Sequence, residues 1–204
     1  MNVYFINLKD LININPSMQH KKALSNLLVK KLLAKEMDVP EQKIQLTKTS
    51  FGKPYVIDDM RHFNVSFSNE MFMMVTNNTE VGADIEFIKD INDIDDVISH
   101  FAPEEQTALS SLQHAEKIEC FYRLWVLKES YIKAIGKGFS CPLDSFYIAD
   151  NLSNCSLVYA AEKELNWIFK SYSFPEGYKS AVCAKTGTLF KNPIVLYGHD
   201  VLNA

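Results

Sequence analysis

The chain has 204 residues, a length that suits one domain or two small ones. Apolar residues make up 47% of it, enough for a sizeable core, and the formal net charge of −4 argues against a nucleic acid or an anionic membrane as partner. No run approaches the roughly 20 apolar residues of a membrane span, and residues 1–8 lack the basic start and long apolar core of a signal peptide.

The first half of the chain predicts strands around one long helix. Apolar residues at helical spacing indicate a helix that begins near Asn15 or Ser17 and continues to about Glu36. Alternating apolar residues and turn signals predict the other elements. These are a first strand at 1–8, a short strand at 43–49, a turn at 52–54, and two strands at 63–68 and 71–77.

The second half repeats this order of elements. It predicts a strand at 81–87, a loop or short helix at 88–98, a helix opening at 101–105, a long helix at 115–135, and strands at 146–149, 157–160, 167–174 and 179–184. The repeated order indicates an α+β fold of two similar halves. We place the first lobe at 1–81 and the second at 82–204, and we expect them to pack tightly because no flexible linker separates them.

The four cysteines all lie in the second half and form no C-x-x-C pair, and the histidines do not cluster with them. Zinc ligands normally come in closely spaced pairs, so this spacing argues against a zinc site. We therefore expect a reduced, cytoplasmic protein in which the cysteines serve as small apolar residues.

Two carboxylates share one face of the predicted strand at 81–87. The period of two puts Asp84 and Glu86 on the same face as Gly82, with apolar residues on the other face. Mg²⁺ prefers oxygen ligands and takes one or two protein carboxylates together with substrate phosphates. This face therefore suits a divalent cation, although a solvated strand face would show the same alternation.

The long helix carries a lysine in the middle of its apolar face. At about 100° per residue, Lys128 falls among the apolar positions, and Glu129 and Lys133 lie one turn apart on the rim, next to Trp125. An unpaired buried charge is very costly, so either this face borders a polar cavity or Lys128 is paired inside. Both arrangements indicate a site, whereas Glu129 and Lys133 alone could form an ordinary i,i+4 pair.

Together these stretches resemble the 4′-phosphopantetheinyl transferases of the Sfp type. The family's G-x-D-x-E strand is matched by G-A-D-I-E at 82–86, and its W-x-x-K-E-x-x-x-K helix by the nine residues at 125–133. F-G-K-P-Y at 51–55 and F-N-V-S-F-S at 63–68 resemble the segments that precede them. Further matches follow in order at 136–138, 142–146, 170–172 and 177–183.

The resemblance implies two similar α/β lobes related by pseudo-twofold symmetry, with the cofactor between them. It also implies a Mg²⁺-dependent enzyme that transfers the 4′-phosphopantetheine arm of coenzyme A to a serine of an apo acyl or peptidyl carrier protein. The other product would be adenosine 3′,5′-bisphosphate. Because relatives with a single lobe must oligomerise to build the cleft, the length of this chain favours a monomer.

The resemblance also assigns roles in catalysis. It implies that Asp84, Glu86 and Glu129 hold Mg²⁺. It places Lys133 against the transferred phosphate, where the cation would offset developing charge. Glu129 is the first candidate for the general base that takes the serine proton.

Lys128 and Glu105 also take part in this scheme, and each has an alternative role. Lys128 would either assist at the phosphate or pair with a carboxylate. Glu105 matches a family glutamate in register and is the second candidate for the general base. The alternative for Glu105 is a solvated glutamate that the helix dipole favours in a first turn.

The coenzyme A contacts rest on the resemblance as well. His20 and Lys21 match a His-Arg pair that binds the 3′-phosphate, and Lys53 matches a lysine that faces the nucleotide. Ser66 would contact a phosphate. Phe67 replaces the histidine that the family usually carries beside this serine, and phenylalanine cannot donate a hydrogen bond. This change bears on coenzyme A affinity more than on the chemistry.

Because Phe67 replaces the histidine, two alternative functions remain. One is a non-catalytic homologue that binds coenzyme A or carriers without turnover. Another is a different Mg²⁺-dependent phosphoesterase that uses the same carboxylates on water. The sequence does not name the carrier, because fatty-acid, polyketide and nonribosomal-peptide carriers all fit.

Overall fold

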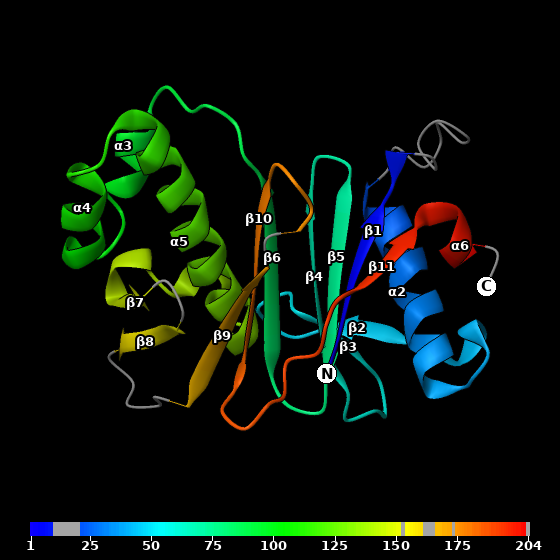
Figure 1. Ribbon diagram of the computed structural model, residues 1–204. Helices are drawn as coiled ribbons and strands as arrows, with labels where there is room; N and C mark the ends of the chain where they lie inside the picture. The colour runs from blue at the N-terminus through cyan, green and yellow to red at the C-terminus, as the bar shows by residue number, and fades with distance from the viewer. Residues whose placement is uncertain (10–20, 152–153, 161–165, 173, 203–204) are drawn as a thin grey trace.

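The computed structural model describes residues 1–9, 21–151, 154–160, 166–172 and 174–202. They form two main sheets that lie face to face, with one long helix on the outer side of each (Figure 1). The first sheet consists of β11 (Ile194–Tyr197), β1 (Asn2–Asn7), β5 (Met71–Asn77) and β4 (His62–Ser68), in that order, and carries α2 (Lys21–Met37). A hairpin of β2 (Leu46–Lys48) and β3 (Pro54–Val56) lies before β4 in the chain.

The second sheet carries the longest helix of the described residues, α5 (His114–Ile135). Its strands are, in order, β6 (Val81–Phe87), β10 (Tyr178–Lys185), β9 (Trp167–Tyr172), β8 (Asn154–Ala160) and β7 (Phe146–Asn151). Two short helices, α3 (Ile94–Ile98) and α4 (Pro103–Ser110), lead into α5. None of the described helices is both long enough and apolar enough to span a membrane.

The two lobes share one strand order. In the first, β1 pairs with β5 and β5 with β4, all antiparallel, and α2 lies between β1 and β4 in the chain. In the second, β6 pairs with β10 and β10 with β9, again antiparallel, and α5 lies between β6 and β9. The predicted α+β fold with two similar lobes is therefore confirmed.

The end of the chain departs from the division at residues 81 and 82. That division assigns all of 82–204 to the second lobe, but β11 pairs in parallel with β1, and α6 (Gly198–Leu202) packs on α2. Val201 is buried in the core of the first lobe. The cause is the edge of β1, whose unpaired backbone groups gain partners from β11.

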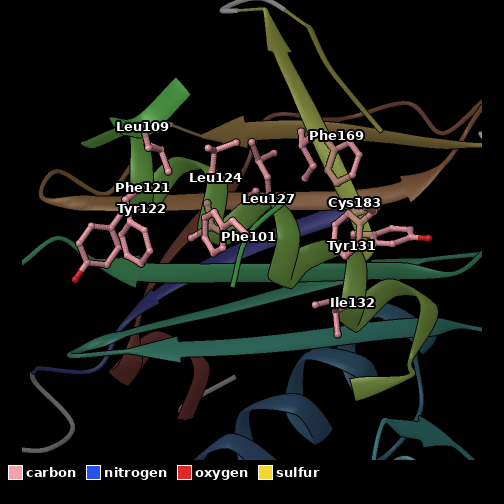
Figure 2. Packing of buried hydrophobic residues seen from close by; sticks show 14 of the residues in the cluster. Phe101, Leu109, Phe121, Tyr122, Leu124, Leu127, Tyr131, Ile132, Phe169 and Cys183 are labelled. Atoms are coloured by element: carbon pink, nitrogen blue, oxygen red, sulfur yellow. The ribbon is translucent and has the colours of Figure 1, made fainter. Parts of the chain in front are cut away.

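Three apolar clusters hold the layers together. One lies between α5 and the second sheet (Figure 2), and another between α2 and the first sheet. The third joins the two sheets, so the lobes are packed as tightly as the missing linker predicts. Its buried members are Val3, Phe5, Met71, Met73, Val75, Val81, Ala83, Ile85, Tyr172, Val182 and Ala184.

Helix α5 ends where the sequence predicts. Gly136 adopts the left-handed conformation, with φ of +70°, and its N–H donates to the carbonyl of Ile132 at 3.0 Å. Glycine accepts this conformation without the penalty that a Cβ brings. The predicted strand at 81–87 is also present as β6, whereas the predicted start of the first helix near Asn15 or Ser17 lies outside the described residues.

Gly82 marks the closest approach of β6 to α5. A Cβ at this position would lie 2.0 Å from the carbonyl oxygen of Ser130 and 2.3 Å from the amide nitrogen of Ala134. Both are main-chain atoms of α5, so a larger residue cannot fit unless the helix moves. The glycine beside the two carboxylates therefore sets the distance between β6 and α5.

We expect Gly82→Ala to lower the free energy of unfolding by about 3 kcal/mol or more, because the added methyl overpacks a main-chain contact. Gly187→Ala is the control, since Gly187 has φ of +90° and a Cβ added there would meet nothing within 4 Å. It should cost only about 1–2 kcal/mol of backbone strain. Urea unfolding of both variants measures the difference, and equal losses would contradict the close packing of α5 on β6.

Candidate active site

A row of polar side chains joins β4 to β6, the neighbouring edge strands of the two lobes. Asn64 Oδ1 accepts from the N–H of Ala83 at 2.9 Å. Ser66 Oγ donates to Asp84 Oδ1 at 2.7 Å, and Ser68 Oγ donates to Glu86 Oε2 at 2.8 Å. We call these contacts, made by alternate residues of β4, the polar seam. They orient both carboxylates that the sequence singled out.

Lys133 of α5 completes the centre of the polar seam. Its Nζ lies 2.5 Å from Asp84 Oδ1 and donates to Ser66 Oγ at 3.1 Å. The structure thus brings together a strand of each lobe and the long helix at one point. The other oxygen of Asp84, Oδ2, is buried and has no hydrogen-bond partner among the described residues.

Glu86 and Glu129, the two glutamates around this point, both have a raised pKa. Burial is the largest cause of the raised pKa of Glu129, followed by the charge of Asp84, with Lys133 opposing and Glu86 adding to the rise. Burial also raises the pKa of Glu86, and the charge of Asp84 adds to it, while the hydrogen bond from Ser68 opposes it. Two glutamates whose pKa is raised by burial and by a neighbouring carboxylate are a feature of functional sites.

The donor set suits a hard cation, although the described residues hold no ready-made cluster of three metal ligands. Asp84, Glu86 and Glu129 offer carboxylate oxygens, which are the donors that Mg²⁺ prefers. The buried Oδ2 of Asp84 needs a partner that no described residue supplies. In this arrangement the Lys133 ammonium is the cation that neutralises Asp84.

A cavity of about 750 Å³ opens beside these residues. Trp125, Glu129 and Lys133 of α5 line one side, and segment 51–54 with Asn64 lines another. The cavity therefore takes its walls from both lobes, and two of the charged residues predicted from the helix motif face it.

Lys128 is paired inside the protein, which is one of the two arrangements that its position on the helix allows. Its Nζ is fully buried and lies 2.6 Å from Glu105 Oε2, 2.8 Å from the carbonyl of Phe146 and 4.2 Å from the centroid of the Phe146 ring. Burial lowers the pKa of Lys128, and the charge of Glu105 opposes this shift. Lys128 is held in this buried pair on the core side of α5, so the structure has the paired alternative and not the one at the phosphate.

Glu105 requires a correction. It is 3% exposed, neither a solvated first-turn residue nor a cavity residue. Besides the Lys128 ammonium, it accepts the N–H of Ile148 at 3.0 Å and that of Ala102 at 3.2 Å. A carboxylate that is buried, held by three donors and outside the cavity is not placed to take a proton from a docked substrate, so Glu105 leaves the set of candidate bases.

The predicted coenzyme A contacts have different outcomes. Ser66 is buried in the polar seam, between Asp84 and Lys133, and its contact with a phosphate stays a prediction. Lys53 lines the cavity, but its Nζ donates to two main-chain carbonyls. His20 lies outside the described residues, and of Lys21 only the backbone, as the first residue of α2, is described. Phe67 packs against the core of the first lobe.

Sequence reasoning missed Asn64 and Ser68 as site residues. A signal was present, because period two along β4 puts both on the face of Ser66. What the pattern does not reveal is the opposing strand. The contacts join residues 18 or 19 apart in the chain across two different sheets.

The chain is similar to known proteins over most of its length. The model of the 4′-phosphopantetheinyl transferase superfamily matches residues 80–183, which include β6 and α5. The 4′-phosphopantetheinyl transferase gsp of Aneurinibacillus migulanus is 36% identical over 182 residues, which cover 89% of this chain and 72% of that protein. The 4′-phosphopantetheinyl transferase Sfp of Bacillus subtilis is 31% identical over 166 residues, which cover 81% of this chain and 74% of that protein.

Among solved structures, holo-[acyl-carrier-protein] synthase of Thermotoga maritima aligns with a TM-score of 0.43 at 13% identity. The alignment covers 54% of this chain and 64% of that one.

The buried pair predicts a strongly non-additive response to mutation. Lys128→Met leaves the Glu105 carboxylate buried without its cation, so we expect a loss of about 3–5 kcal/mol in the free energy of unfolding. The double variant Lys128→Met/Glu105→Gln removes both charges and keeps an oxygen for the Ile148 N–H, so it should lose clearly less. Urea unfolding of both single variants and the double variant tests this, and strictly additive losses would contradict the pairing.

Proposed function

The chain belongs to the 4′-phosphopantetheinyl transferase superfamily, and we propose that its transfer reaction takes place at the polar seam. The enzyme transfers the phosphopantetheine group of coenzyme A to a carrier protein. The observation that carries the assignment of the site is the meeting of Asp84, Ser66 and Lys133 beside a cavity between the lobes. The reaction would release adenosine 3′,5′-bisphosphate.

Asp84, Glu86 and Glu129 would hold Mg²⁺, and the orphaned Oδ2 of Asp84 supports this donor set. When bound, the cation supplies neutralisation of charge on the pyrophosphate of coenzyme A. The three residues come from β6 and α5, which the contact at Gly82 holds at a set distance. The rigidity of that contact would keep the carboxylates aligned through the reaction.

Lys133 would contact the phosphate that is transferred. Its side chain is 29% exposed and faces the cavity, so a small change of rotamer carries the ammonium from Asp84 toward a bound anion. Ser66 donates to Asp84 and accepts from Lys133, and it can turn its hydroxyl to a phosphate oxygen in the same way. Both groups would offset charge as the phosphoryl bond breaks.

Glu129 is the best placed base for the carrier serine. It lines the cavity, and burial together with Asp84 raises its pKa toward the range in which a carboxylate accepts a proton efficiently. The serine oxygen would attack the phosphorus that bears the pantetheine arm. The serine proton would pass to Glu129, and the bond from this phosphorus to the bridging oxygen would break, so that oxygen leaves with the adenosine bisphosphate.

We also propose a cytoplasmic monomer. Both walls of the cavity come from a single chain, so the site needs no second copy. Cys120, Cys141 and Cys183 form no disulfide among the described residues, as a reducing compartment favours.

The direct test is the intact mass of an apo acyl carrier protein after incubation with the enzyme, coenzyme A and Mg²⁺. We expect a gain of one phosphopantetheine group that is lost when EDTA is added. Asp84→Ala should slow transfer by about 10²-fold or more, because it removes a central charged group of the site. Asp90→Ala, at an exposed aspartate outside the site, is the matched control and should keep full activity.

No gain of mass with several apo carriers, from a folded protein, would overturn the proposed function. Equal loss in the Asp84 and Asp90 variants would instead overturn the place of the site.

The contact of Lys133 with Asp84 makes a separate prediction about the cation. An ammonium on Asp84 competes with a divalent cation for the same oxygen, so Lys133→Met should raise affinity for Mg²⁺ in the absence of coenzyme A. The expected rise is on the order of tenfold, about 1.4 kcal/mol. Calorimetry with Mg²⁺ alone measures it, with Lys117→Met as control, because Lys117 pairs with an exposed aspartate outside the site. Unchanged or weaker cation binding in Lys133→Met would contradict the competition.

A further inference from the structure

Lys53 belongs to the first lobe, but its ammonium group binds the second. Its Nζ donates to the carbonyl of Val81, the first residue of β6, at 3.0 Å. It also donates to the carbonyl of Ala134, in the last turn of α5, at 2.8 Å. One side chain therefore ties the segment before β3 to the strand and the helix that carry the site.

The carbonyl of Ala134 is a favourable partner for a cation. The last four carbonyls of a helix have no partner within the helix, and the C-terminal end of the helix dipole is negative. Ala134 directly follows Lys133, and α5 ends one residue later at Ile135. Lys53 thus caps the end of α5 from the other lobe.

Gly136 makes room for the aliphatic part of Lys53. A Cβ on Gly136 would lie 3.1 Å from Cδ of Lys53 and 3.8 Å from its Cβ, which is tighter than ordinary packing allows for the first of these. The glycine that ends the helix is therefore also the surface over which the lysine stem lies. The G-K-P and G-K-G segments of the sequence meet in this contact.

The turn that carries Lys53 is itself held in place. The N–H of Lys53 donates to Thr49 Oγ1 at 3.1 Å, and the N–H of Thr49 donates to the carbonyl of Lys53 at 2.9 Å. Pro54 follows with its restricted backbone. The lysine is therefore aimed at α5 by an ordered turn, not by a free loop.

We propose that Lys53 is a positioning residue, which locks the C-terminal end of α5 against β6 and thereby places Lys133 and Glu129 opposite Asp84. This assignment replaces the expectation that its ammonium binds the nucleotide. Two of the three N–H donors of Nζ are held by these carbonyls, which fixes the ammonium at the end of the helix.

The charge state of Lys53 is consistent with this role. Burial lowers its pKa to about 8, against the opposing charge of Glu80. Two main-chain carbonyls stabilise the ammonium less than a carboxylate would. The geometry still gives two of its three N–H donors a carbonyl partner, as a buried polar group requires.

The effect on catalysis rests on the proposed function, and calorimetry combined with kinetics tests it. Lys53→Met and Gly136→Ala should each lower kcat about tenfold or more, because misplacing a catalytic group by about 1 Å can cost 10²-fold. The Kd for adenosine 3′,5′-bisphosphate should stay within about threefold of the parent. The double variant should be no slower than the worse single variant, because both changes break one contact. Lys48→Met, at an exposed lysine of β2, is the matched control and should change neither kcat nor Kd.

A rise of tenfold or more in that Kd for Lys53→Met, with Gly136→Ala unchanged, would overturn the proposal and return Lys53 to the nucleotide. Hydrogen exchange of the amides at 132–136 needs no activity. Protection there should fall at least tenfold in Lys53→Met and stay constant in Lys48→Met, and unchanged protection would also overturn the proposal. If the parent protein transfers no phosphopantetheine, but Lys53→Met still loses protection at 132–136, only the proposed function is contradicted.

Discussion

The structure depends on how two edge strands meet without forming a ladder. Strands β4 and β6 belong to different sheets, and side chains of Asn64, Ser66 and Ser68 bridge them where backbone hydrogen bonds would otherwise lie. A continuous sheet would leave less room for polar side chains between the lobes. The polar seam instead aims two carboxylates at the gap and satisfies part of an edge that would be exposed. The proposed active site lies where these two strands adjoin, because Asp84, Ser66 and Lys133 meet there.

One helix supplies both a structural and a functional lysine, and geometry separates them. Lys128 and Lys133 are five residues apart, which turns the second about 140° from the first around α5. Lys128 therefore points into the core and is sealed against Glu105, whereas Lys133 reaches the edge of the cavity and Asp84. Both ion pairs are short, but only the second can be opened by a ligand. Burial decides which pair builds the helix packing and which can take part in chemistry.

Two contacts fix the position of α5: its main chain packs closely on β6, and the ammonium of Lys53 caps its C-terminal end. Gly82 lets the helix backbone approach β6, and Lys53 ties its last turn to the first lobe. Such restraints matter because the site is assembled from three elements far apart in the chain. A helix that could slide by a fraction of a turn would separate Glu129 from Asp84. The apolar core shared by the two sheets gives the same restraint on a larger scale.

The sequence by itself determined what depends on local pattern. Period two showed which face of β6 bears Asp84 and Glu86, helical spacing put Glu129 and Lys133 on one rim, and the repeated order of elements indicated two similar lobes. Tertiary structure decided what depends on partners distant in the chain. Glu105 is buried against Lys128, and the last strand, β11, pairs with β1 of the first sheet. Pairing between remote segments leaves no periodic pattern in the sequence of either segment. The same reason hid the role of Lys53 and the seam residues, whose partners are backbone groups or side chains of another sheet.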